Sequence, residues 1–336
     1  MGGSFDVIVL GAGPAGSSCA RRAAELGARV LILEKSDFPR AKPCGAGLTD
    51  KTLALMGGEE KQVEHRRFDS AEIAFGRHLS LMVGSPNPLI VTTTRRELDA
   101  RLVASAETAG VRVDFGRPAT ALEESGSDVR VTAGSDSLTA PCVVVADGAR
   151  GVGRRMLGLA PMHLGGGAYV RAFPEQEEAA ESASRGVLFD ITAAKRGYGW
   201  IFPKRGHLNV GVFSQRPLDA DLTRELRDFL ACRGLDAWRT EGPFAFPVPV
   251  GRPGDALGTR RVLCAGDAAG LVNPITGEGI SSAILSGRLA AESVAGGDGR
   301  NPADEYARRV RSEVVPMTDG SRWAGQLVYG MGPTLL

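Results

Sequence analysis

The stretch "FDVIVLGAGPAGSSCARRAAELGARVLILEK", residues 5–35, decides the fold. A short apolar run at 7–10 precedes the glycines of a G-x-G-x-x-G motif, a helix with an apolar face, and a second apolar run at 28–34. This change of periodicity predicts a β-α-β unit. The three glycines allow a tight turn, close approach of the backbone to a pyrophosphate, and close packing of helix on strand. The stretch therefore predicts an α/β fold that binds a nucleotide.

The residues of this unit have distinct expected roles. The N-terminus of the helix offers unpaired N–H groups and partial positive charge to phosphates. An acidic residue ends the second apolar run, where its carboxylate can accept hydrogen bonds from ribose hydroxyls. We therefore expect cofactor contacts at Gly11, Gly13, Pro14, Ala15, Gly16 and Glu34.

Composition excludes several classes of protein. The 336 residues suffice for one large domain or two interleaved ones. The 40 Lys and Arg against 39 Asp and Glu leave no basic surplus for nucleic acid. Five scattered cysteines without a C-x-x-C pair indicate a reducing cytoplasm, and Cys19, Cys142 and Cys264 lie in apolar runs that predict core residues. We expect no signal peptide, no membrane-spanning segment and no metal site, although the chain could still touch a membrane surface.

Two distant segments share a buried strand run that ends in an Asp/Gly pair. They are "CVVVADGARGVGRRM" at 142–156 and "RRVLCAGDAAGLVNPITGEGISSAI" at 260–284. They resemble the paired DG and GD motifs of flavoproteins related to para-hydroxybenzoate hydroxylase. In that family the second aspartate holds the ribityl chain of FAD, and the loop after it passes under the isoalloxazine ring. The resemblance favours FAD over NAD and implies cofactor contacts at Asp147, Asp267, Pro274, Gly277 and Gly279.

The sequence departs from this family's motifs at one position and matches the family at one further position. The DG motif has Gly151 where the family usually has serine. The helix expected within 92–113 carries Arg95 four residues before Asp99, as its family counterpart does, which implies that Arg95 contacts the cofactor. A second nucleotide motif is missing from the sequence. We therefore expect a transient electron donor, either NAD(P)H or a small redox protein.

The middle of the chain has a different pattern. Short strand-like runs at 165–173, 186–191, 197–204 and 207–215 are separated by Gly, Pro or charged residues, which predicts an antiparallel sheet. The acidic run at 175–184 reads as a solvated loop or short helix.

The run "GYGWIFPK", residues 197–204, is the most informative of these strands. Alternate side chains share one face of a strand, so Tyr198, Trp200 and Phe202 would form an apolar wall for a substrate. The glycines and Ile201 on the opposite face would meet another backbone or the cofactor. The alternative is an ordinary stripe of core residues.

Together, "KPCGAGL" at 42–48 and the Y-x-W-x-F-P pattern of 197–204 resemble the geranylgeranyl reductase family. Its members use FAD to saturate C=C bonds of isoprenoid chains. The resemblance implies a Rossmann-like FAD-binding domain with an interleaved, mainly antiparallel β-sheet substrate domain and a short helical C-terminal tail. We assign residues 1–60, 90–155 and 255–300 to the first domain, 61–89 and 156–254 to the second, and 301–336 to the tail.

Cys44 lies in the first of these two motifs. Reduction of an unactivated alkene needs a hydride and a proton in a pocket that excludes water. A thiol is protonated at neutral pH, so Cys44 is a candidate for the catalytic proton donor. A thiolate role would need a nearby cation, for which Lys42 is a candidate. In the third interpretation Cys44 only fills a tight turn.

The expected function is FAD-dependent reduction of an apolar isoprenoid or other hydrophobic substrate. One alternative is a monooxygenase or halogenase-like enzyme, in which reduced FAD reacts with O₂. Another is a flavoprotein that passes electrons to a membrane quinone. The tail should begin with a helix capped by Asn301, with Pro302 in its first turn. That tail either packs on the FAD-binding domain or lies on a membrane surface.

Overall fold

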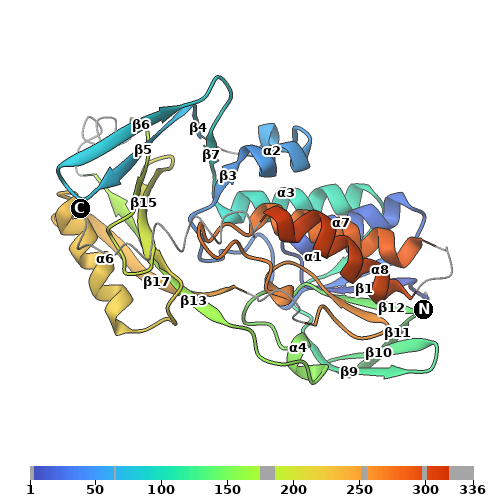
Figure 1. Ribbon diagram of the computed structural model, residues 1–336. Coiled ribbons are helices and arrows are strands. Elements are labelled where there is room, and N and C mark those ends of the chain that lie inside the picture. Colours follow the sequence, from blue (N-terminus) through green and yellow to red (C-terminus); the bar gives the residue numbers. More distant parts are fainter. Residues whose placement is uncertain (1–3, 64–65, 175–185, 251–255, 297–300, 318–336) are drawn as a thin grey trace.

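The computed structural model describes residues 4–63, 66–174, 186–250, 256–296 and 301–317. Its first layer is a five-stranded parallel sheet with the order β18-β12-β1-β2-β8 (Figure 1). The strands are β1 (Val7–Leu10), β2 (Val30–Leu33), β8 (Arg112–Asp114), β12 (Cys142–Val145) and β18 (Val262–Cys264). Strands β18, β12, β1 and β2 are apolar and buried because both faces of the sheet are covered, as parallel sheets require, whereas the edge strand β8 contains Arg112 and Asp114.

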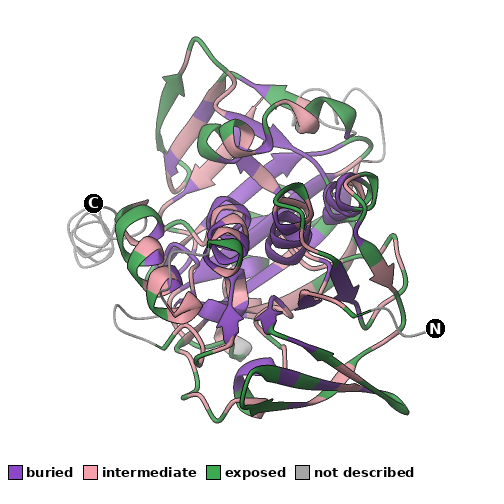
Figure 2. Ribbon diagram, turned by 90° about the vertical axis from the view of Figure 1, so that its right-hand side faces the viewer, coloured by how far each residue is buried: buried purple, intermediate pink, exposed green. Residues whose placement is uncertain are grey.

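Helices cover one face of this sheet and a small sheet covers the other (Figure 1). The helices are α1 (Pro14–Glu25), α3 (Arg95–Thr108) and α7 (Ile280–Ala295). Val7 and Val9 of β1 face them, while Ile8 and Leu10 face the opposite side. That side carries the antiparallel strands β9 (Ala119–Ser125), β10 (Asp128–Ala133) and β11 (Asp136–Ala140). The predicted Rossmann-like domain is confirmed, and Figure 2 shows its central strands as buried.

A seven-stranded sheet forms the second part of the molecule, with the order β17-β13-β16-β15-β14-β5-β6. All neighbouring strands are antiparallel except β14 and β5, which are parallel. The strands are β5 (Ser70–Phe75), β6 (Leu79–Gly84), β13 (Leu164–Phe173), β14 (Val187–Asp190), β15 (Gly197–Pro203), β16 (Leu208–Ser214) and β17 (Arg239–Pro249).

Strand β15 has the alternation that its sequence predicts. Trp200 and Phe202 belong to an apolar cluster on one face, and Ile201 belongs to the core under α6 (Ala220–Cys232) on the other. A Cβ atom on Gly199 would lie 2.8 Å from the Phe229 ring of α6. Gly199 therefore makes room for a helix, while a Cβ on Gly197 would meet the backbone of β16 at Phe213 and Ser214.

A three-stranded sheet connects the two parts. It has the order β3-β7-β4, from β3 (Gly47–Thr49), β4 (Arg66–Phe68) and β7 (Ile90–Thr92). The sheet spans the boundaries that we place near residues 60 and 90, so the division into domains stays a proposal. Short helical segments complete the fold: α2 (Asp50–Met56), η1 (Glu59–Gln62), α4 (Gly153–Met156) and η2 (Gly266–Ala269).

The last described segment is α8 (Pro302–Arg309), followed by a π-helical turn at Val310–Val314. The Asn301 side chain accepts a hydrogen bond from the Ala303 N–H at 3.2 Å, as expected for a cap. Tyr306 is fully buried, and its hydroxyl donates to the Cys264 carbonyl at 2.7 Å. This helix therefore docks on the FAD-binding domain. The acidic run at 175–184 and residues 318–336 lie outside the described part.

The predicted core cysteines Cys19, Cys142 and Cys264 are buried and unbridged. Burial raises the pKa of Cys19 and of Cys264 to about 12. Within the described ranges, no helix combines the length and the apolar character needed to cross a bilayer.

Candidate active site

A cavity of about 650 Å³ lies between the five-stranded and the seven-stranded sheets. One wall comes from the residues at the carboxyl ends of β1, β2 and β12, and another from residues 246–249 of β17. Open α/β sheets bind ligands at the carboxyl ends of their strands. The cavity brings together these predicted site residues: Gly11, Gly13, Pro14, Ala15, Glu34, Cys44, Arg95, Asp147, Asp267, Gly277 and Gly279.

The three motif glycines differ in their surroundings. Gly11 has φ +99°, and a Cβ atom there would lie 2.6 Å from the Ala146 carbonyl oxygen. A Cβ on Gly16 would lie 1.9 Å from the Gly11 carbonyl oxygen, so this residue serves packing and does not line the cavity. The nearest neighbour of a Cβ on Gly13 would be Arg40, 3.7 Å away. Gly13 thus leaves open space in front of the helix.

Two guanidinium groups face this space. Arg95 is buried and forms a bidentate pair with Asp99 at 2.7 and 2.8 Å. Arg40 contacts the same carboxylate at 3.1 Å, and both arginines come within 4 Å of the Cβ position of Gly13. Helix α1 has no side-chain cap, so its first N–H groups are available as well. Arg40 was not predicted from the sequence, because it belongs to no motif that would place it beside the glycine turn.

Glu34 and Asp147 both bond to nearby backbone. The carboxylate of Glu34 accepts hydrogen bonds from Ala12 N–H at 2.8 Å and Ser36 N–H at 2.9 Å. Asp147 accepts from Gly153 N–H at 2.8 Å. Burial raises the pKa of Asp147, and backbone donors oppose that rise. These bonds hold both carboxylates at the edge of the cavity.

The orientation of Asp147 accounts for the departure at position 151. A Cβ on Gly151 would lie 2.0 Å from an oxygen of the Asp147 carboxylate. Serine at this position would force that carboxylate to rotate away. The glycine therefore fits the conformation of Asp147 in this chain.

Asp267 pairs with Lys42 at 2.9 Å. Burial acts to raise the pKa of Asp267, but the charge and hydrogen bond of Lys42 outweigh it, so the pKa is lowered. We named Lys42 as the cation that could support a Cys44 thiolate. The structure instead places its ammonium on Asp267.

The loop at 273–279 is held against the seven-stranded sheet. The Tyr198 hydroxyl donates a hydrogen bond to the Thr276 carbonyl, and the Gln215 amide donates to the Pro274 carbonyl at 2.9 Å. Gly277 has φ +63°, and a Cβ there would lie 3.2 Å from the Phe213 ring. Pro274 and Tyr198 do not line the cavity; they support the loop that does.

The turn that contains Cys44 packs on the aromatic strand. A Cβ on Gly45 would lie 3.1 Å from the Phe202 ring, and one on Gly47 would lie 2.9 Å from it. The Trp200 indole N–H donates to the Asn209 side chain at 2.7 Å, and the Asn209 amide donates to the Cys44 carbonyl at 3.3 Å. The two motifs that carried the narrower resemblance are therefore in direct contact.

Trp200 and Phe202 do not line the cavity. They are 4% and 7% exposed and lie behind the turn, in a cluster with Phe189, Tyr198 and Phe213. Their contact with a substrate therefore stays a prediction. The cavity wall on that side comes from β17, which the sequence analysis did not single out.

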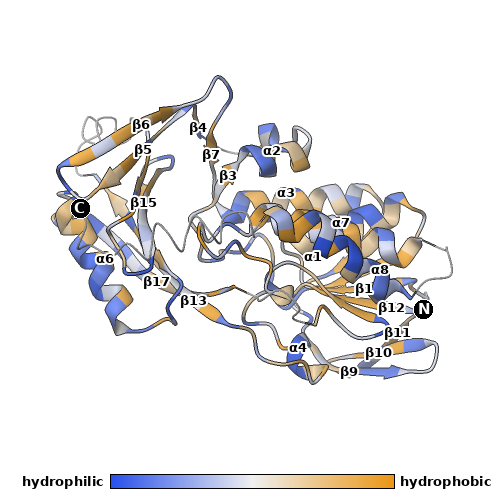
Figure 3. Cartoon of the chain, in the orientation of Figure 1, coloured by the Kyte–Doolittle hydropathy of each residue, from blue (hydrophilic) through white to orange (hydrophobic). Residues whose placement is uncertain are grey.

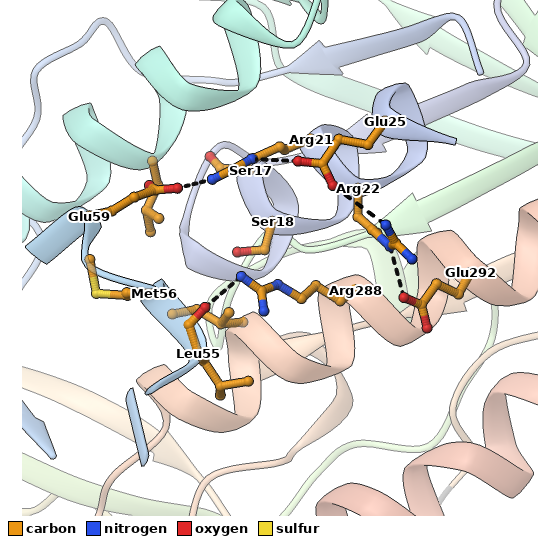
Figure 4. A pocket seen from close by; sticks show the side chains of 12 residues that line it. Ser17, Ser18, Arg21, Arg22, Glu25, Leu55, Met56, Glu59, Arg288 and Glu292 are labelled. Carbon is orange, nitrogen blue, oxygen red and sulfur yellow. Dashed lines mark hydrogen bonds and ion pairs between the residues drawn. The ribbon is translucent and has the colours of Figure 1, made fainter. Parts of the chain in front are cut away.

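A second, smaller cavity of about 290 Å³ lies between α1, α2 and α7 (Figure 4). It is lined by three arginines and three glutamates. Arg22 pairs with Glu292 at 2.8 Å, and Arg288 donates to the Leu55 carbonyl. These contacts join α7 to α1 and to α2, and none of the predicted active-site residues lines this cavity.

Comparisons with known proteins agree with this geometry. The FAD-binding domain family matches residues 4–205. The chain is 34% identical over 314 residues to a menaquinone reductase of Mycobacterium tuberculosis, covering 86% of this chain and 76% of that protein. It is 32% identical over 316 residues to digeranylgeranylglycerophospholipid reductase 1 of Methanopyrus kandleri, with coverages of 86% and 80%.

A solved structure shares the fold. The geranylgeranyl bacteriochlorophyll reductase-like protein of Thermoplasma acidophilum aligns with a TM-score of 0.81 at 23% identity. The alignment covers 97% of this chain and 87% of that one.

Proposed function

The chain belongs to the FAD-binding domain family, among its geranylgeranyl reductase-like oxidoreductases, and on this premise we propose that it saturates C=C bonds of polyprenyl chains. One observation carries the proposal. The Cys44 turn packs directly on Trp200 and Phe202, and Cys44 lines the same cavity as the nucleotide-binding residues.

The substrate class rests on the relatives and on the cavity wall. Menaquinone and digeranylgeranylglycerophospholipid, for which the relatives are named, both carry polyprenyl chains. The cavity wall includes apolar side chains from three segments, among them Phe246, Val248, Val272 and Ile280. Such a wall suits an isoprenoid chain and excludes water from the reacting carbons.

The cavity residues suit FAD. Gly13, the uncapped start of α1, Arg40 and Arg95 would bind the pyrophosphate, and Glu34 would bind ribose. Asp267 and the loop at 277–279 would hold the ribityl chain and the ring. Bound and reduced, FAD supplies a hydride. The electron donor would be transient, either NAD(P)H or a small redox protein.

Cys44 would deliver the proton that the reaction also needs. Its S–H bond breaks as a C–H bond forms on the substrate, so the alkene gains a hydride and a proton. The sulfur then carries the electron pair and accepts the Ala46 N–H, which lies 3.3 Å away. Solvent returns a proton to the thiolate between turnovers.

A polyprenyl lipid would reach the enzyme from a membrane, and β6 is the segment suited to contact one. Four of its apolar side chains are exposed: Leu79 by 57%, Leu81 by 62%, Met82 by 60% and Val83 by 38%. The strand forms the outer edge of the seven-stranded sheet (Figure 3). An exposed apolar cluster of this kind is typical of an interaction surface.

A single-turnover experiment tests the reaction. The FAD-loaded protein is reduced without oxygen and mixed with a menaquinone or a geranylgeranyl lipid, while flavin absorbance and product mass are followed together. We expect flavin reoxidation with two hydrogens gained in the prenyl chain. Menaquinol with an unchanged chain would establish quinone reduction, which the name of the mycobacterial relative also favours. Flavin that stays reduced until O₂ is admitted, with oxygen then found in product, would establish a monooxygenase.

A further inference from the structure

Lys204 follows the aromatic strand and is only 6% exposed. Its ammonium donates to three backbone carbonyls: Gly45 at 2.7 Å, Ala46 at 3.1 Å and Thr93 at 2.7 Å. Across the described ranges it forms no ion pair, whereas Arg95 is neutralised by Asp99. Burial lowers the pKa of Lys204 to about 7, and electrostatic interaction with Cys44 acts in the opposite direction. A buried cation without a carboxylate partner is costly and calls for a specific role.

The role follows from the geometry of one peptide group. In a trans peptide the C=O and N–H bonds point in opposite directions. Lys204 binds the Gly45 carbonyl, so the Ala46 N–H of the same peptide points the other way, toward the Cys44 sulfur at 3.3 Å. Ala46 has φ +48°, a left-handed conformation that costs energy for a residue with a Cβ atom. The ammonium is placed to offset that cost.

We propose that Lys204 is a positioning residue, which aims the Ala46 N–H at the Cys44 sulfur and stabilises that sulfur after it loses its proton. An ammonium on the carbonyl polarises the whole peptide, so its N–H becomes a better donor. Asn209 holds the preceding carbonyl, that of Cys44, and so completes the restraint on the turn. That the Cys44 thiolate forms during catalysis rests on the proposed function. The effect of Lys204 on the Cys44 sulfur through the Gly45–Ala46 peptide, which we call the relay, does not depend on that function.

Alkylation of Cys44 measures thiolate formation without any turnover. The FAD-loaded protein is treated with iodoacetamide at about pH 6.5, below the Lys204 pKa of about 7, where most of the amine is charged, and labelling of the Cys44 peptide is followed by mass spectrometry. We expect Lys204→Met to slow labelling roughly fivefold, the effect of one lost hydrogen bond. Lys204→Gln, which keeps amide donors but no charge, should fall between. Lys195→Met, a change at an exposed lysine, should match the unmodified protein.

Labelling of Cys19 and Cys264 reports folding, because both are buried in the native protein. An unchanged Cys44 rate in Lys204→Met, with these two cysteines unlabelled, would overturn the proposal. If Cys19 and Cys264 become labelled in Lys204→Met, the test uses Lys204→Gln instead. An unchanged Cys44 labelling rate in Lys204→Gln would then overturn the proposal. Since no alkene is involved, slower labelling would support the relay even if the protein failed to reduce prenyl chains.

Discussion

At the scale of single residues, the glycines of the G-x-G-x-x-G motif have different structural roles. Gly13 faces open space beside two arginines, whereas Gly16 touches the backbone of Gly11. We expect Gly13→Ala to keep the free energy of unfolding within about 1 kcal/mol of the original, since glycine and alanine differ modestly at a helix start. It should lose FAD, because the new methyl group would occupy the space in which we propose that the pyrophosphate binds.

Gly16→Ala should lower the free energy of unfolding more than Gly13→Ala does, and should affect FAD binding less directly. Its methyl group would meet a backbone oxygen that cannot move aside, and overpacking of this kind costs about 1–3 kcal/mol or more. Urea unfolding and flavin content per chain, measured on both variants, separate the two effects. Gly13→Ala with full flavin content would show that the pyrophosphate lies elsewhere.

The residue scale is also where sequence reasoning reached its limit. Gly11 and Glu34 were predicted from motif and spacing and Asp267 from the family resemblance, and all three line one cavity. Arg40 and Lys204 were not assigned, because a lone cation acquires its role only from partners that folding brings close. Lys204 and Gly45 lie 159 positions apart in the chain. Lys42 was tied to Cys44 by proximity in sequence, yet its ammonium lies on Asp267.

At the scale of elements, alternation predicted which side chains of β15 share a face, but not what each face meets. The period of a strand sorts residues into two sets, and only the topology of the sheet supplies their neighbours. Trp200 and Phe202 meet the Cys44 turn, Gly199 meets α6, and Gly197 meets the backbone of β16. Strand β17, which completes the cavity wall, has no motif of its own and could not be identified in advance.

Strand β6 supports a prediction about membranes. Its exposed side chains Leu79 and Leu81 share one face of the strand and should enter the bilayer surface, and each buried apolar side chain contributes about 1.5–3 kcal/mol. We expect the double substitution Leu79→Ser with Leu81→Ser to weaken binding to phosphatidylglycerol vesicles at least about tenfold. Sedimentation with the vesicles gives the bound fraction.

The matched control is Leu218→Ser, which removes an exposed leucine that follows β16. It should bind vesicles as the unmodified protein does. Equal binding by the β6 variant and the control would move the membrane contact to another surface.

At the scale of the whole molecule, the two large sheets meet around the cavity, and each contributes a wall. The sequence predicted both sheets, because a G-x-G-x-x-G unit and a series of short strands have distinct periodicities. It did not predict how the small β3-β7-β4 sheet joins them, since these strands have only three residues each. A cofactor in this cavity contacts both parts and should therefore stabilise the molecule as a unit.

Asp267 allows this coupling to be measured. A ligand that binds only the folded protein adds about 2.7 kcal/mol at a concentration of one hundred times its Kd. We expect the unfolding temperature of the unmodified protein to rise steadily with added FAD. Asp267→Ala should need far more FAD for the same rise, because it removes the carboxylate that we propose binds the ribityl chain and leaves Lys42 without its Asp267 partner. Asp236→Ala, at an exposed position, is the control. By mass action, the rise of the unfolding temperature with FAD concentration reports the affinity for the cofactor. If the unfolding temperature of Asp267→Ala rises with FAD as that of Asp236→Ala does, the ribityl chain does not bind at η2.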